Sequence, residues 1–98
     1  MSNAATVPSS TWMLKGSITF KESAALAKQL GAQLNGIEEI NWSQVQAVDS
    51  SAVSLALELN RLALRHGRRL RHVALPRALM SLANLYGVEH LVSAEPDL

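Results

Sequence analysis

The sequence predicts a single α/β domain with a mostly parallel sheet of about four strands and three helices packed on it. Short apolar segments typical of buried strands alternate along the chain with segments in which apolar residues recur at helical spacing. This alternation is typical of right-handed strand–helix–strand crossovers, which make neighbouring strands parallel. Hydrophobic residues make up 48% of the 98 residues and charged residues 17%, so the chain can bury one real core.

Two strands and a helix make up the first half of the predicted fold. Residues 11–18 predict a strand, in which Gly16 indicates a bulge or a close backbone approach. Residues 23–35 predict a helix that begins at Ser23, because leucines recur there every four residues. Residues 37–45 predict the second strand of the sheet.

The second half continues the same alternation. Residues 50–66 predict a long helix rich in leucine and alanine, residues 71–75 a short strand, and residues 77–86 a helix that follows a proline. Residues 88–92 could add a last short strand. The core is expected to contain these side chains: Leu26, Leu30, Ile40, Trp42, Leu55, Leu59, Val73, Leu75, Leu82 and Tyr86.

Composition limits the class of protein. Residues 1–10 are expected to be an expression-tag remnant and a flexible N-terminus, and residues 11–98 a single domain. The formal net charge of +1 argues against a nucleic-acid binder, which usually carries a strong basic excess. The chain has no cysteine, which fits a reducing compartment, and no apolar run long enough to insert directly into a membrane.

No motif in the sequence predicts catalysis. The three histidines His66, His72 and His90 lack metal-ligand spacing on one helix face, and each is expected to be a solvated residue. There is no glycine-rich phosphate loop and no nucleophile elbow. We therefore expect a protein that is not an enzyme and that has no cofactor and no metal.

The most informative stretch is Asp49-Ser50-Ser51, which directly precedes the long leucine-rich helix. Asp and Ser are favoured there because a side-chain oxygen can accept a backbone N–H that has no partner within the helix. One reading is an ordinary helix start. The other is that Asp49 does most of the capping and leaves the Ser50 hydroxyl free to face a partner.

This stretch also carries a resemblance to a known family. The run Val48-Asp49-Ser50-Ser51-Ala52-Val53 resembles the signature of STAS domains, and the later segment 82–88 resembles one branch, the small STAS subunit of the Mla-type phospholipid ABC transporter. The resemblance implies a STAS-like fold and a cytoplasmic accessory subunit, peripheral at the inner membrane. Its implied partner is the transporter's ATPase subunit, and its implied role is to support assembly or activity in maintaining lipid asymmetry.

The resemblance leaves a second function open. In regulated STAS domains the residue after the Asp is phosphorylated, which would make this chain an anti-sigma-factor antagonist switched at Ser50, with an anti-sigma-factor kinase as its partner. A phosphate would be tolerated there because a helix N-terminus favours an anion. The sequence departs from the regulated pattern at Ala52, where the family usually has Gly, and at Thr19, where regulated members often have Asp. A small-ligand-binding or nucleotide-binding STAS module is a third, weaker possibility.

A polar stripe follows the Asp-Ser-Ser element along the predicted helix. Its side chains recur at i, i+4, i+7 and i+11, so they share one face. This face is either simply solvated or the surface where the partner docks. The expected partner-binding residues are Asp49, Ser50, Ser51, Ser54, Glu58, Arg61 and Arg65. A basic cluster between residues 65 and 72 is expected to be solvated, or otherwise to meet an acidic partner or anionic headgroups.

Overall fold

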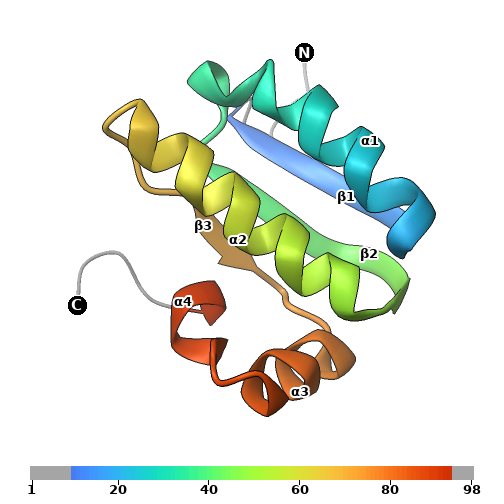
Figure 1. Ribbon diagram of the computed structural model, residues 1–98. Helices are drawn as coiled ribbons and strands as arrows, with labels where there is room; N and C mark the ends of the chain where they lie inside the picture. The colour runs from blue at the N-terminus through green and yellow to red at the C-terminus, as the bar shows by residue number, and fades with distance from the viewer. Residues whose placement is uncertain (1–9, 94–98) are drawn as a thin grey trace.

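The computed structural model describes residues 10–93, which form a small α/β fold (Figure 1). Its strands are β1 (Thr11–Ile18), β2 (Glu39–Val48) and β3 (Arg71–Val73). Its helices are α1 (Phe20–Gly31), α2 (Ser50–Arg65), α3 (Arg77–Leu85) and α4 (Glu89–Ser93), with a short 3₁₀ helix η1 (Leu34–Gly36) after α1. The predictions for residues 1–9 and 94–98 lie outside the described residues.

The three strands form one sheet in the order β1-β2-β3, and both strand pairs are parallel. The predicted parallel α/β architecture is therefore confirmed, although the described residues hold three strands rather than about four. The expected last strand at residues 88–92 is wrong, because helix α4 occupies this segment. Its apolar residues Val88, Leu91 and Val92 are spaced i, i+3, i+4, which is a helical period.

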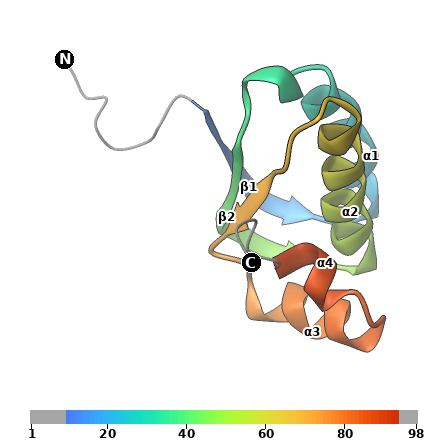
Figure 2. The ribbon, with the colours of Figure 1, turned by 90° about the vertical axis from the view of Figure 1, so that its left-hand side faces the viewer.

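The helices cover one face of the sheet. Figure 2 shows α1 and α2 side by side on that face and no helix on the opposite face of the part that the structure describes. Helices α3 and α4 lie beyond the β3 side of α2, and both contact α2. Residues 10–93 thus contain four α-helices rather than three, and α2 contacts each of the other three.

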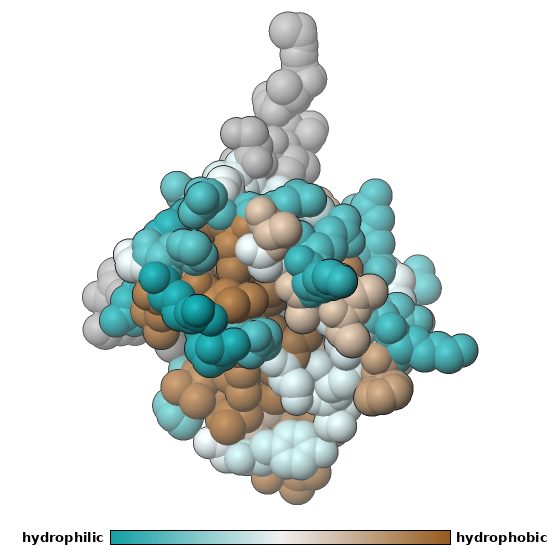
Figure 3. Space-filling model, turned by 45° about the horizontal axis from the view of Figure 1, so that its top comes forward, coloured by the Kyte–Doolittle hydropathy of each residue, from teal (hydrophilic) through white to brown (hydrophobic). Residues whose placement is uncertain are grey.

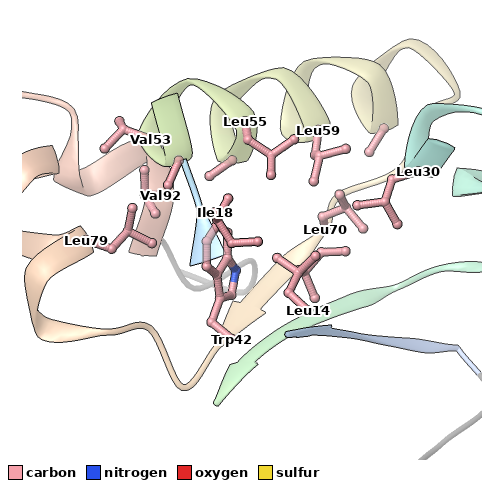
Figure 4. Packing of buried hydrophobic residues seen from close by; sticks show 14 of the residues in the cluster. Leu14, Ile18, Leu30, Trp42, Val53, Leu55, Leu59, Leu70, Leu79 and Val92 are labelled. Carbon is pink, nitrogen blue, oxygen red and sulfur yellow. The ribbon is translucent and has the colours of Figure 1, made fainter. Parts of the chain in front are cut away.

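The core lies between α2 and the sheet. Leu55 and Leu59 point from α2 toward Trp42 of β2 and the side chains of β1 (Figure 4). The predicted core residues Leu30, Ile40, Trp42, Leu55 and Leu59 are all buried, whereas Leu26, Val73, Leu75 and Leu82 are partly buried. Tyr86 is a wrong prediction, since it follows the last residue of α3 and is 54% exposed.

Two local features differ from or refine the predicted elements. Helix α1 begins at Phe20 rather than Ser23, because the Glu22 carboxylate accepts the backbone N–H of Thr19 at 3.0 Å and fixes an earlier start. The bulge expected at Gly16 is confirmed by its φ of +76° and by register shifts on both sides of it.

Candidate functional site

The Asp49 carboxylate joins the N-termini of α1 and α2. Asp49 precedes α2, and its Oδ1 accepts the backbone N–H of Ser51 at 2.8 Å and also the Ser51 hydroxyl. Its Oδ2 accepts the backbone N–H of Phe20, the first residue of α1, at 3.1 Å. These bonds hold the pKa of Asp49 below its usual value, first through the Ser51 hydroxyl and then through the two backbone groups. The prediction that Asp49 caps the helix is confirmed.

The two serines after Asp49 have different environments. The Ser51 hydroxyl donates to Asp49 and is half-buried, so it belongs to the cap. Ser50 is exposed, and its hydroxyl makes no hydrogen bond within residues 10–93. Phe20, whose backbone N–H donates to the neighbouring Asp49, is 79% exposed. The structure therefore presents one unused hydroxyl and one aromatic ring where the two helices begin.

The polar stripe continues from this point along α2. Ser54 and Arg65 are exposed, and Glu58 and Arg61 form a two-point ion pair with Nε–Oε1 and Nη2–Oε2 distances of 3.0 and 2.6 Å. The guanidinium lowers the pKa of Glu58, and the carboxylate raises that of Arg61. The seven residues expected to bind a partner thus occupy the N-terminus and one outward face of a single helix.

The chain matches one family model, described as "Mlab, STAS domain", over residues 3–93. The chain belongs to the STAS domain family. No curated protein shows significant similarity to it. The match covers the Asp-Ser-Ser element, the α2 stripe and all the elements of the sheet.

The two departures of this STAS domain from the regulated pattern have structural explanations. Ala52 is fully buried inside the first turn of α2, where the backbone is helical and glycine is not needed. Thr19 precedes α1, and its hydroxyl donates to Glu22. Hydrogen bonding from Thr19 lowers the pKa of Glu22, so this position serves the start of α1.

One buried residue of the STAS domain was missed by the sequence reasoning. His72 of β3 was expected to be solvated, but it is only 9% exposed and bonds to side chains of β2 and α2. The Trp42 indole donates to its Nδ1 at 2.9 Å, so Nδ1 carries no proton, and Nε2–H donates to Asn60 Oδ1 at 2.8 Å. The Asn60 amide then donates to the carbonyl of Leu91 in α4 at 3.0 Å. Burial lowers the pKa of His72 to about 4.

The basic cluster divides into structural and exposed members. The Arg68 guanidinium donates to the carbonyls of Leu34 at 2.8 Å, Ile37 at 2.6 Å and Asn35, which closes the end of η1. Arg71 pairs with Glu39 at 2.7 Å. Arg65, His66 and Arg69 are exposed. The hydrogen bonds of Arg68 and His72 join residues 12 to 34 positions apart in the chain. The one local signal for His72 was its place in a predicted strand before Val73.

Neither a metal centre nor a membrane span is found in the part of the chain that the structure describes. Between residues 10 and 93, no three His, Asp or Glu side chains gather as metal ligands would. None of the described helices has the length and apolar content needed to cross a bilayer.

Proposed function

We propose that this STAS domain is a non-catalytic accessory subunit that binds the cytoplasmic ATPase of a Mla-like phospholipid ABC transporter. It docks through the loop at residues 49–54 and the outward face of α2, and it supports assembly or activity of the transporter. Its place is in the cytoplasm, at the inner membrane, held there by its partner. The family description, which carries the Mlab name, supports this choice among STAS domains.

The observation that supports the proposal is that the three polar residues at the start of α2 have different roles. The Asp49 carboxylate accepts the backbone N–H and the hydroxyl of Ser51. Ser50, in contrast, is exposed, and its hydroxyl has no hydrogen-bond partner in residues 10–93. A small hydroxyl there lets a partner approach the helix N-terminus closely. The exposed ring of Phe20 beside it offers the kind of aromatic side chain that anchors protein interfaces.

The second function is an anti-sigma-factor antagonist switched by a kinase at Ser50. The exposed Ser50 hydroxyl favours it, because a kinase can reach the group and the α2 N-terminus can accept the phosphate. In such a switch the added charge of nearly two units would block the partner without unfolding the domain. Both functions place the partner on the same surface.

The test is co-purification with the ATPase subunit for Ser50→Ala and Ser50→Glu, with a thermal melt of each variant. Ser50→Ala should bind like wild type and change stability by less than about 0.5 kcal/mol, since it removes no internal bond. Ser50→Glu should fold normally, because an acid is welcome at a helix N-terminus, yet lose binding by burying an unpaired charge. Ser81→Glu is the matched control on α3, where Ser81 is exposed.

A second variant tests the stripe independently of the loop. Arg65→Glu reverses the charge of an exposed residue in the last turn of α2. It should weaken the complex more than it alters the fold, although a carboxylate is less favourable than a guanidinium at a helix C-terminus. Full ATPase binding by both Ser50→Glu and Arg65→Glu would rule out this surface as the docking site. Capture of a sigma-factor regulatory kinase instead of an ATPase would favour the second function.

A further inference from the structure

A groove runs between α2 and α4, away from the Ser50 end of the domain. It has a volume of about 360 Å³, within the range of roughly 300–1,000 Å³ that is common for small-ligand pockets. One wall is the C-terminal half of α2, and the other is α4. Figure 3 shows apolar surface lying among polar side chains on the face turned toward the viewer.

The floor and walls of the groove are mainly apolar. Leu57 and Leu64 come from α2 and Leu91 from α4. Leu64 is 58% exposed and Leu91 50% exposed, although both line a concave surface. Concave apolar surface that residues 10–93 leave unfilled is a usual feature of a ligand site.

The position of α4 is fixed by a chain of hydrogen bonds that begins in the core. Asn60, which also lines the groove, donates to the carbonyl of Leu91 at 3.0 Å and accepts from His72 at 2.8 Å. His72 in turn is bonded to the buried Trp42. The groove is therefore preformed, so a ligand would not have to order it.

The polar rim of the groove is basic. Arg61, Arg69 and His90 line it, and among residues 10–93 no Asp or Glu does. Arg61 is already paired with Glu58. Arg69 has no ion pair or hydrogen bond through its side chain within residues 10–93, and it is exposed. An anionic group at the mouth of the groove would find a guanidinium able to bind a carboxylate or phosphate in two-point fashion.

We propose that the groove between α2 and α4 binds a single-chain amphiphile with an anionic head group, such as a fatty acid. The acyl chain lies along Leu57, Leu64 and Leu91, and the head group is bound by Arg69 at the rim. A fatty acid and a lysophospholipid with a phosphate share this chemistry. Amphiphile binding requires no partner protein, so it can be tested independently of ATPase docking at Ser50.

The test is calorimetric titration of the full chain with dodecanoate and with dodecyltrimethylammonium, each below its critical micelle concentration. Dodecanoate should bind saturably to one site, and the cationic amphiphile of equal chain length should bind at least about tenfold more weakly. Dodecyl phosphate, titrated in the same way, distinguishes a phosphate head group from a carboxylate. Shifts of the backbone amide signals of Leu64 and Leu91 should accompany binding.

Two pairs of matched variants locate the site. Arg69→Glu and Leu64→Asp should each weaken dodecanoate binding at least about tenfold, because they remove the head-group contact and the chain contact. Arg77→Glu and Leu85→Asp make the same changes at exposed positions of α3 outside the groove and should bind like wild type. Equal binding of the anionic and cationic amphiphiles, no saturable binding, or equal effects in variants and controls would each overturn the proposal.

Discussion

At the scale of single residues, His72 is held in one protonation state by its two neighbours. Its Nδ1 accepts the Trp42 indole N–H, and an imidazolium would place a second N–H against that donor. Its Nε2–H is used by Asn60. Burial adds the cost of desolvating a charge, and together these explain why the pKa falls to about 4.

This environment predicts that stability decreases as the pH falls from about 6.5 to about 4. In that interval the unfolded chain binds a proton at His72 and the folded chain does not, so protons favour unfolding. The contribution of neutral His72 to the free energy of unfolding is fully present above about pH 6.5, and about 2 kcal/mol of it should be lost by pH 5. Urea denaturation at about pH 7.5 and pH 5 measures the difference.

His72→Gln should be less stable at both pH values but should lose most of this pH dependence. The exposed histidine His66 provides the control, and His66→Gln should keep the wild-type dependence. A pH dependence that survives in His72→Gln would mean that another group is responsible.

At the scale of elements, the turn after α1 is stabilised by a side chain from a distant part of the chain. The turn after α1 exposes the carbonyls of Leu34 and Ile37, and Arg68 donates to both from the segment after α2. Unpaired carbonyls at a half-buried helix end are costly, and one planar guanidinium satisfies several of them. Arg68 thus fixes how η1 and the start of β3 lie against each other.

We predict that Arg68→Lys destabilises the domain by about 1–3 kcal/mol, because an ammonium cannot reach these carbonyls with the same fork geometry. The adjacent Arg69 is the control, since it makes no such bonds, and Arg69→Lys should stay within about 0.5 kcal/mol of wild type. Chemical denaturation of both variants decides the point. Equal stabilities would show that water replaces the guanidinium.

At the scale of the whole molecule, α2 is the element on which the fold depends. It packs on the sheet through Leu55 and Leu59, touches α1 on one side and contacts α3 and α4 on the other. Leu59 is fully buried, in the middle of this interface. Loss of packing at Leu59 should therefore weaken the contacts of α2 with the sheet and with the other helices.

Leu59→Ala should lower the free energy of unfolding by about 2–5 kcal/mol, because it leaves a cavity in a rigid core. The exposed Leu64 of the same helix is the control, and Leu64→Ala should cost much less. Thermal or urea unfolding of the two variants gives the comparison. A wild-type-like melt of Leu59→Ala would show that this part of the core repacks.

The parts of the fold that were predictable from the sequence are those with local causes. The leucine period of α2, the Asp49 cap and the glycine bulge at Gly16 each depend on residues close in sequence. The contacts made by Arg68 and His72, and the bond from Asp49 to Phe20, join residues far apart, and no period or motif encodes them. Residues 88–92 were wrongly predicted as a strand. A segment of five residues with a β-branched valine at each end fits a strand and a helix equally well.

The Gly16 bulge also bears on self-association. In the described chain β1 and β3 are the outer strands, and outer strands invite pairing with other copies. Two register shifts break up β1, exposed Lys15 lies between them, and β3 is only three residues long. Neither edge of the described sheet offers a long, flat, uncharged strand on which another copy could pair, so edge-to-edge aggregation is disfavoured.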